Sequence, residues 1–337
     1  MERVEFGTTA DGTPVEKVSI TSDALRLEVI TLGAVIRDLR PRGGPMRDRP
    51  LVLGLGSVAD YEQHSPYFGA IAGRNANRIG NGQFTLDGKA YQVTRNTPAG
   101  HHLHGGHDGF GKRVWRIADA SDEAVTLEIT GPDGEDGYPG TLQASVTYRL
   151  EGRTLACELN AETDAPTLCN LALHSYFNFD GSPSIRDHIV MIAAGQFTPC
   201  DADLIPTGAI EPVAGTPYDF RQARRIDDFD TLYDANYCLG TEPLHSPVHA
   251  ARVESDRTGV AMDLYTTEPG VQFYDGAKIR VPVPGLEGAA YGAHAGLCLE
   301  PQRWPDAPNH ADFPSSVLRP GETYRQVTEY RFDWPED

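Results

Sequence analysis

Hydrophobic and polar residues alternate along much of this chain, a pattern typical of half-buried β-strands. The alternation is clearest at positions 25–29, 125–129 and 142–150, where apolar residues take every second position. Asp87-Gly88 and Glu151-Gly152 each lie between two apolar runs and predict hairpin turns. Many of the 35 Gly and 25 Pro also lie between apolar runs. The pattern therefore predicts many short antiparallel strands.

Helical patterns are rare and short. The best candidate is the segment 57–62, with Ser57 as a possible N-cap. We find no linker, repeat or low-complexity tract, and 39% hydrophobic residues are enough for a sizeable core. The predicted fold class is all-β, a large antiparallel β-sandwich with few short helices.

The charge balance excludes some classes of partner. With 29 Lys+Arg against 48 Asp+Glu the net charge is −19, which would repel phosphate backbones and anionic lipid. We therefore expect no nucleic-acid partner and no membrane association. The five cysteines are scattered and never spaced as C-x-x-C, which fits a reducing cytoplasm. No signal peptide or membrane-spanning apolar run is expected from the sequence.

Glu300 is the first candidate for chemistry. It follows Leu297-Cys298-Leu299, an apolar run that predicts a buried strand. Burial disfavours a charged carboxylate and raises its pKa, which suits a general base near neutral pH. Read alone, such a glutamate is more often a surface or ion-paired residue at a strand end. Its interpretation depends on the partners that other segments supply.

Four other segments could supply these partners. They are Gly73-Arg74-Asn75-Ala76-Asn77-Arg78-Ile79, Leu103-His104-Gly105-Gly106, His174-Ser175-Tyr176-Phe177-Asn178 and Tyr265-Thr266-Thr267-Glu268-Pro269-Gly270-Val271-Gln272-Phe273-Tyr274. Together with Cys298-Leu299-Glu300 they occur in the order and approximate spacing of one family. The chain resembles the aldose 1-epimerases, or galactose mutarotases, from Phe6-Gly7 to the segment Leu318-Arg319-Pro320-Gly321-Glu322.

This resemblance implies one elongated domain over residues 1–337, with a sugar site in a cleft on a concave sheet face. It implies Glu300 as the base and His174 as the acid, with His104 assisting near the ring oxygen. The residues that would hold the sugar hydroxyls are Asn77, Arg78, Asp234 and Gln272. The family commonly has Asn at the position of Leu173 and often has His at the position of Ala235. The outer contacts of the site therefore differ in this chain.

The reaction implied is the interconversion of the α and β anomers of a free aldose such as galactose or glucose. Two proton transfers are enough for ring opening and closure, so neither a cofactor nor a metal is expected. A monosaccharide is the expected partner, and the chain would be a monomer or a homodimer.

Three other features of the sequence admit a functional or a structural interpretation. The run His101–His107 could suggest a metal site, but a solvated loop is the preferred interpretation for His101, His102 and His107. A glycine pattern at 54–59 resembles a dinucleotide fingerprint but lacks the βαβ context. Trp304 and Phe110 could stack on a sugar ring or pack in the core.

Two alternative functions stay open at this point. One is a mutarotase for a pentose or a hexose phosphate. A phosphate would need a cluster of cations, and the sequence offers only scattered candidates, such as Arg221, Arg224 and Arg225. The other is a non-catalytic sugar-binding protein, which would need no acid–base pair.

Overall fold

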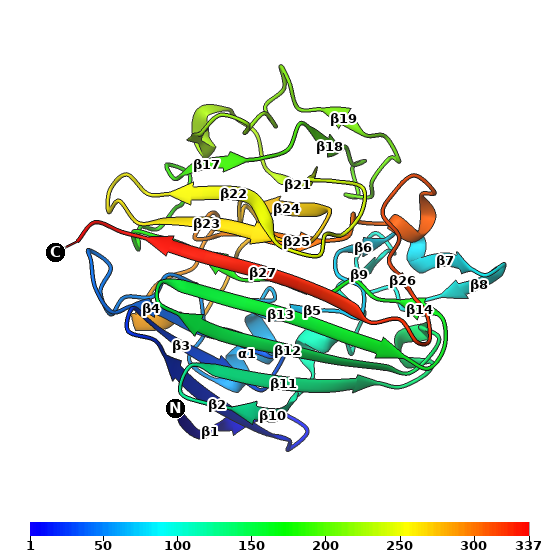
Figure 1. Cartoon of the computed structure of the whole chain (residues 1–337), viewed down its shortest axis with the longest axis horizontal. Coiled ribbons are helices and arrows are strands. Elements are labelled where there is room, and N and C mark those ends of the chain that lie inside the picture. The colour runs from blue at the N-terminus through cyan, green and yellow to red at the C-terminus, as the bar shows by residue number, and fades with distance from the viewer. Residues whose placement is uncertain (337) are drawn as a thin grey trace.

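The computed structural model describes residues 1–336 and consists mainly of antiparallel β-sheets (Figure 1). The largest sheet has nine strands in the order β10 (Arg116–Ala120), β11 (Ala124–Gly131), β12 (Leu142–Glu151), β13 (Thr154–Thr163), β27 (Tyr324–Asp333), β23 (Ala261–Thr266), β22 (Val248–Glu254), β17 (Ile189–Ile192) and β20 (Arg224–Arg225). Strand β27 thus lies between β13 and β23, although it is far from both in sequence.

A second sheet has six strands and carries three of the candidate residues, Asp234, Gln272 and Glu300. Its order is β16 (Tyr176–Phe177), β25 (Leu297–Gln302), β24 (Gly270–Tyr274), β21 (Asp234–Cys238), β18 (Gln196–Thr198) and β19 (Glu211–Pro212). A third sheet has the order β1 (Glu2–Thr8), β2 (Pro14–Thr21), β3 (Leu25–Ile30) and β4 (Val35–Pro41).

The remaining elements are short. Two-stranded pairs are β14 (Thr167–Leu168) with β26 (Val317–Leu318), β15 (Ala172–Leu173) with β5 (Ile71–Ala72), β6 (Arg78–Ile79) with β9 (His102–Leu103), and β7 (Gln83–Leu86) with β8 (Lys89–Gln92). Helix α1 spans Val58–His64, and 3₁₀ turns occur at Gly80–Gly82, Phe110–Lys112, Glu135–Gly137, Ile226–Asp228, Leu286–Gly288 and Ala307–Asn309. Within residues 1–336, none of the helices has the length and apolar character that a membrane crossing requires.

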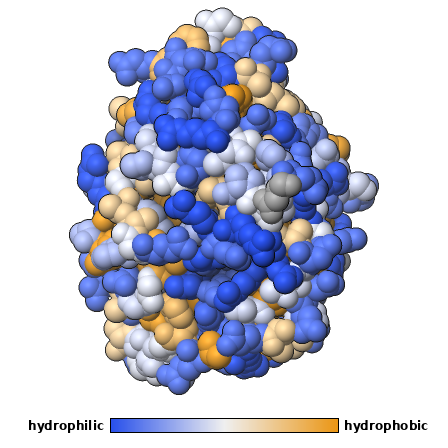
Figure 2. Space-filling model, turned by 90° about the vertical axis from the view of Figure 1, so that its left-hand side faces the viewer, coloured by the Kyte–Doolittle hydropathy of each residue, from blue (hydrophilic) through white to orange (hydrophobic). Residues whose placement is uncertain are grey.

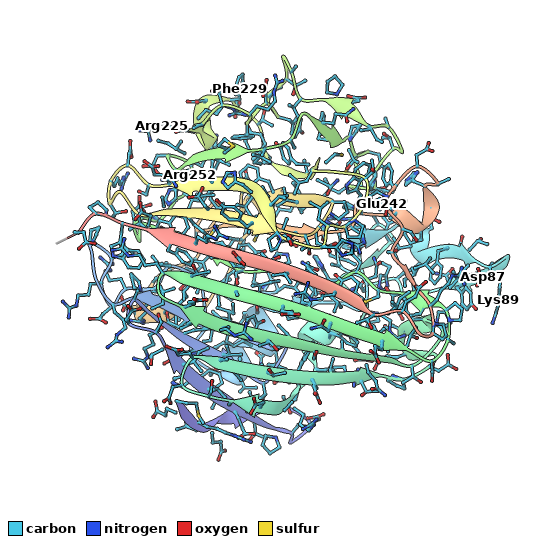
Figure 3. The ribbon with its side chains drawn as sticks, in the orientation of Figure 1. Asp87, Lys89, Arg225, Phe229, Glu242 and Arg252 are labelled. Atoms are coloured by element: carbon cyan, nitrogen blue, oxygen red, sulfur yellow. The ribbon has the colours of Figure 1, made fainter. Side chains whose placement is uncertain are left out.

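Local signals in the sequence predicted several of these elements correctly. The hairpin β7–β8 turns at Asp87 and Gly88, whose φ angles of 50° and 77° suit a tight left-handed turn. Asp87 and Lys89 lie at its projecting tip (Figure 3). Ser57 caps α1 by accepting a hydrogen bond from the Asp60 backbone N–H at 3.1 Å. The glycine-rich segment that follows Leu53 leads into this short helix, and no βαβ unit forms there.

The two large sheets bury one shared hydrophobic cluster. Leu127, Val146 and Leu264 join it from the nine-stranded sheet, and Phe273 and Leu299 join it from the six-stranded sheet. Leu127 and Val146 come from apolar faces that the period-two pattern predicted, and Leu299 comes from the apolar run predicted to be a buried strand. The all-β sandwich prediction is therefore confirmed. The surface at the end shown in Figure 2 is mainly hydrophilic, with small apolar areas between polar ones.

Glu28 breaks the predicted alternation, because it is buried where a polar, exposed residue was expected. Three cations surround its carboxylate: Lys17 at 3.2 Å, Arg26 at 2.7 Å and Arg37 at 2.6 Å. Burial alone would raise the pKa of Glu28, but these neighbouring charges outweigh it and lower the pKa. The carboxylate is therefore tolerated inside because it is ionised and paired.

We predict that Glu28→Gln lowers the free energy of unfolding at pH 7 by about 1.5–3 kcal/mol, since charged hydrogen bonds are lost. A carboxyl group whose pKa is lower in the folded than in the unfolded protein contributes stability at pH values above its unfolded pKa. This contribution is lost as the pH falls through the folded pKa. The difference between wild type and variant should therefore shrink below about pH 4. Urea unfolding at pH 7 and at pH 3.5 measures both effects.

The matched control is Glu16→Gln on β2, which removes a more exposed carboxylate paired with Arg3. Such a pair contributes less than about 1 kcal/mol. Equal losses in the two variants, or a Glu28 effect that grows at low pH, would contradict the prediction.

Candidate active site

Strand register brings the candidate residues of the six-stranded sheet onto one face. Gln272 lies directly opposite Glu300, and Asn236 lies opposite Gln272. A neighbouring row on the same face contains Asp234, Tyr274, Cys298 and Tyr176. Because side chains alternate between faces, the intervening Phe273 and Leu299 point into the hydrophobic cluster instead.

Glu300 and His174 form the centre of this face. Glu300 Oε1 lies 3.7 Å from His174 Nε2, and both side chains are almost completely buried. The second carboxyl oxygen, Oε2, is buried without a hydrogen-bond partner. An unpartnered buried oxygen is costly, so this atom is available to a ligand that brings a donor.

The surroundings of Glu300 favour its neutral form. Desolvation raises its pKa well above the ordinary carboxyl value, the negative charge of Asp234 adds to this, and Arg78 opposes it. The pKa shift expected from the apolar run before Glu300 is therefore present.

His174 is held between aromatic rings. Tyr176 and Tyr67 stack on it with centroids at 5.0 and 5.9 Å, and His104 meets it edge-on at 5.1 Å. Desolvation lowers the pKa of His174 to about 4. At neutral pH, burial therefore favours the state in which Glu300 is protonated and His174 is neutral.

His104 is oriented by the backbone of Asn77. The backbone N–H of Asn77 donates to His104 Nδ1 at 3.1 Å, and the backbone N–H of His104 donates to the Asn77 carbonyl at 3.0 Å. Both residues have positive φ, 59° for Asn77 and 48° for His104. Since Nδ1 accepts a hydrogen bond, the neutral imidazole carries its proton on Nε2. Desolvation, followed by the neighbouring His174, lowers the His104 pKa well below 6.5.

Arg78, Asp234 and Gln272 form a polar group beside the pair. Gln272 Nε2 donates to Asp234 Oδ1 at 2.7 Å, and Arg78 Nη2 lies 3.9 Å from Asp234 Oδ2. Arg78 is partly exposed, and Gln272 Oε1 is buried without a partner. The group therefore offers both donors and acceptors next to Glu300.

Arg74, from the same motif as Arg78, has a structural role. Its buried guanidinium donates to the carbonyls of Pro132, Pro139 and Gly140. It thereby fixes the segment from Pro132 to Gly140.

Two histidines differ from their predicted environment. His101 and His102 are buried, so the prediction of a solvated loop is wrong for them. His102 Nε2 accepts a hydrogen bond from the Tyr138 hydroxyl at 2.6 Å, and Nδ1 donates to the Thr94 carbonyl at 2.6 Å. Tyr138 lies far along the chain, so no local pattern indicated this pairing.

Trp304 and Phe110 both pack internally. Trp304 contacts Phe313 edge-on at 5.1 Å and donates Nε1–H to the Pro269 carbonyl, and Phe110 packs against Trp115. Neither ring is available to stack on a ligand. Tyr67, in contrast, was missed by the sequence analysis and contacts both site histidines.

Two groups of side chains in residues 1–336 have atoms close enough to share a metal ion: His174, Cys298 and Glu300, and Asp180, Asp187 and His188. In the first group, burial raises the Cys298 pKa well above its ordinary value. Binding of a metal there would have to displace the thiol proton, since metals bind the thiolate. In the second group, Arg257 lies 3.7 Å from Asp180 and 2.8 Å from Asp187, and it already compensates their charge.

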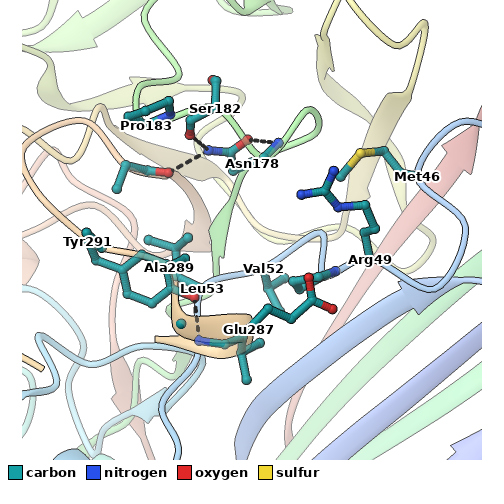
Figure 4. Close-up of a pocket in the computed structure, with 16 residues that line it drawn as sticks. Met46, Arg49, Val52, Leu53, Asn178, Ser182, Pro183, Glu287, Ala289 and Tyr291 are labelled. Atoms are coloured by element: carbon teal, nitrogen blue, oxygen red, sulfur yellow. Dashed lines mark hydrogen bonds between the residues drawn. The ribbon is translucent and has the colours of Figure 1, made fainter. Parts of the chain in front are cut away.

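A cavity of about 380 Å³ lies elsewhere, between Met46, Arg49, Val52 and Tyr291 (Figure 4). One of its polar side chains bonds within the lining: Asn178 Nδ2 donates to the carbonyls of Ser182 and Ala295. None of the predicted site residues lines this cavity.

Comparison with known proteins places this geometry in a family. The family model for aldose 1-epimerase matches residues 16–331. Galactose mutarotase from Homo sapiens is 42% identical, covering 98% of this chain and 98% of that protein. Aldose 1-epimerase from Escherichia coli (strain K12) is 36% identical, covering 96% of each. The chain belongs to the aldose 1-epimerase family.

Solved structures agree with this assignment. An aldose epimerase homologue from C. elegans superposes with a TM-score of 0.88 at 31% identity, covering 94% of this chain and 98% of that one. Galactose 1-epimerase from Lactobacillus acidophilus shares the fold with a TM-score of 0.83 at 23% identity. The resemblance inferred from the motifs is confirmed, and so is the predicted enzyme class, an isomerase that interconverts aldose anomers.

The loop that carries His104 yields a testable prediction. Gly105 has a φ of 91°, and a Cβ added there would lie 1.7 Å from the Gly73 carbonyl oxygen. Gly105→Ala should therefore displace His104, lower the thermal midpoint and reduce kcat/KM for galactose. The control is Gly100→Ala, which has a φ of 83° but no atom within 4 Å of the added Cβ.

Gly100→Ala carries only the backbone strain, about 1 kcal/mol, and should keep its activity. Thermal unfolding and polarimetry of both variants make the comparison. Equal behaviour of the two variants would show that the close approach to Gly73 does not position His104.

Proposed function

We propose that this protein catalyses mutarotation of free aldoses through the Glu300–His174 pair. The observation that carries the proposal is the burial of these two groups 3.7 Å apart, with Glu300 Oε2 left unpartnered. The C1 hydroxyl of a sugar could donate the hydrogen bond that this oxygen lacks. The family relationship gives the reaction class, and the geometry supports the proposed choice of residues.

Glu300 acts as the base and His174 as the acid. Glu300 takes the proton of the C1 hydroxyl while His174 protonates the ring oxygen, which breaks the C1–O5 bond and yields the open-chain aldehyde. Rotation about C1–C2 exposes either face of the carbonyl. The two groups then exchange roles, returning the proton to O1 and taking the proton from O5 as the ring closes. No atom or electron is gained or lost overall.

The pair must hold one proton in total for this cycle. Burial places that proton on Glu300 in the free protein, as the raised pKa of Glu300 and the lowered pKa of His174 indicate. Sugar binding must then favour the carboxylate and the imidazolium. Arg78, which lowers the pKa of Glu300, and hydroxyl donors of the sugar both act in this direction.

The remaining site residues are proposed to orient the sugar. Arg78 and Asp234 face each other and can bind neighbouring hydroxyls, while the amide of Gln272 bonds to Asp234 and the amide of Asn77 bonds to Arg78. His104, with its proton on Nε2, is proposed to assist near the ring oxygen. Orientation of this kind contributes because both proton transfers require short distances.

The sugar-phosphate alternative is not favoured by the surroundings of the site. Arg221 pairs with Asp219, Arg225 pairs with Asp256, and Arg224 stacks on Phe220 at 3.6 Å. Arg225 and Phe229 lie on the periphery of the molecule (Figure 3). These cations are already engaged, so the preferred substrate is an unphosphorylated aldose. A non-catalytic binder would not require the buried acid–base pair.

Three broader features are part of the proposal. Residues from Val18 to Trp334 share one hydrophobic cluster, which supports a single domain. All five cysteines are free, which supports a reducing, cytoplasmic environment. A hexose is the proposed metabolic substrate, because galactose mutarotase from Homo sapiens is among the relatives.

We predict that Glu300→Gln and His174→Asn each lower kcat for galactose mutarotation by about 10² or more, since each removes one proton-transfer group. Both replacements keep the approximate shape of the side chain. Polarimetry of freshly dissolved α-D-galactose and α-D-glucose measures the rate, with the spontaneous rate subtracted.

The control for these variants is Gln83→Glu, an exposed amide-to-acid change on β7. It should leave kcat unchanged. Near-normal mutarotation by Glu300→Gln or His174→Asn would show that the roles are assigned wrongly, provided that circular dichroism shows a native fold.

The pH dependence follows from the same pair. Activity requires one shared proton, so kcat/KM should have an acid limb and an alkaline limb. It should fall near pH 4, where His174 and Glu300 together gain a second proton, and on the alkaline side only well above the ordinary carboxyl pKa. Initial rates between pH 3.5 and 9, corrected for spontaneous mutarotation, test this. An acid limb near pH 6.5 would mean that His174 titrates as an exposed imidazole.

A further inference from the structure

Tyr67 lies beside both histidines of the site and has an unusual backbone conformation. Its ring centroid lies 4.7 Å from that of His104 and 5.9 Å from that of His174. Its φ is 66°, a left-handed value that is uncommon for a bulky aromatic residue. Such strain persists only where the surrounding structure imposes it, and it is concentrated at functional sites. The ring is therefore held beside the histidines at a cost in free energy.

Hydrogen bonds fix the turn that carries Tyr67 against His174. The backbone N–H of Gly69 donates to the His174 carbonyl at 3.0 Å. The Tyr176 hydroxyl donates at 3.0 Å to the carbonyl of Pro66, the residue that precedes Tyr67. The positions of the two tyrosines are thus linked to each other and to the histidine.

Both tyrosine rings lie nearly parallel to the imidazole of His174. The angle between the ring planes is 20° for Tyr67 and 22° for Tyr176, and the centroid distances are 5.9 and 5.0 Å. The face of an aromatic ring is electron-rich and attracts a cation within about 6 Å of the centroid. The Tyr67 ring already faces one cation, since Lys112 Nζ lies 5.8 Å from its centroid. The two faces should therefore stabilise an imidazolium more than a neutral imidazole.

The other groups that face His174 are Glu300, Cys298 and His104. Glu300 Oε1 lies 3.7 Å from Nε2, the nitrogen that the proton of Glu300 would reach, and Cys298 Sγ lies 3.5 Å from Nδ1. Burial keeps the Cys298 thiol protonated by raising its pKa, and it keeps His104 neutral by lowering its pKa. Beyond the carboxylate of Glu300, the groups left to stabilise a charged His174 are the aromatic faces.

We propose that Tyr67 is a positioning residue that, together with Tyr176, stabilises the imidazolium form of His174 through its ring face. This role rests on the proposed function of His174 as the acid. Part of the imidazolium charge remains in the transition state for protonation of the ring oxygen. The ring face should therefore affect kcat more than KM.

The first test changes the electrostatics of the ring face at nearly constant shape. Tyr67→Phe keeps an electron-rich face, whereas Tyr67→pentafluorophenylalanine, introduced by nonsense suppression, reverses its polarity. Tyr67→Phe should keep most of the wild-type kcat for galactose at pH 7. Relative to Tyr67→Phe, the fluorinated variant should lose roughly 5- to 30-fold in kcat with little change in KM.

The second test is the direction in which the acid limb of kcat/KM moves in the same two variants. A less stable imidazolium lowers the pKa of His174, so the fluorinated variant should gain its second proton at a lower pH than Tyr67→Phe. Loosened packing would instead admit water and move the limb upward from about pH 4, toward the ordinary imidazole value of 6.5. The sign of the shift thus separates a ring-face effect from a structural disturbance.

The matched control is Tyr91 on β8, which is partly exposed like Tyr67 and stacks on Phe84 at 5.3 Å. Tyr91→pentafluorophenylalanine should leave kcat and the acid limb unchanged. Equal kcat in the fluorinated and the phenylalanine variants at position 67, or an acid limb that stays or rises, would overturn the proposal. A large loss in Tyr67→Phe would also overturn it, because the hydroxyl and not the ring face would then be the active group.

Failure of the wild-type protein to mutarotate any aldose would overturn the proposed function instead. In that case ¹⁵N titration of His174 in sugar-free protein still tests the ring face, with the signals assigned by difference from His174→Asn. Fluorination at position 67 should lower the pKa of His174 relative to Tyr67→Phe, and an unchanged pKa would refute the stabilisation.

Discussion

The burial of one carboxyl group, that of Glu300, is the constraint on which the site depends. Strand β25 is covered on both faces, with Leu299 packed into the hydrophobic cluster and Glu300 on the opposite face. Removing a carboxylate from water is expensive unless it is protonated or paired. This cost keeps the pair with His174 in its neutral form until a ligand supplies hydrogen-bond donors. Arg78 lies near enough to lower the pKa of Glu300, and its own contact is with Asp234, 3.9 Å away.

Much of the fold and the site could be predicted because the relevant signals are local. Period-two alternation predicted the strands, and Asp87-Gly88 predicted a hairpin that the structure contains. Short motifs identified His174 and Glu300 as candidates, and strand register then places Gln272 directly beside Glu300. The distance between Glu300 and His174, and their protonation, depend on packing that no single motif contains.

The errors have a common physical origin in long-range contacts. Glu28 is buried because Lys17 and Arg37, on two neighbouring strands, compensate its charge. His102 is buried because Tyr138 bonds to it from a distant segment. Tyr67 was missed for the same reason: its contact with the site histidines arises only when separate segments of the chain meet.

The place of β27 in the nine-stranded sheet has a consequence for how the protein reaches its native state. Strands β10 to β13 pair in sequence order and can form early, since each contact spans only a short stretch of chain. The sheet becomes continuous only when β27 enters between β13 and β23. Until then β13 has an open edge, which can pair with another copy of the chain. Chaperone demand and aggregation during synthesis should therefore depend on the time between the formation of β13 and its pairing with β27.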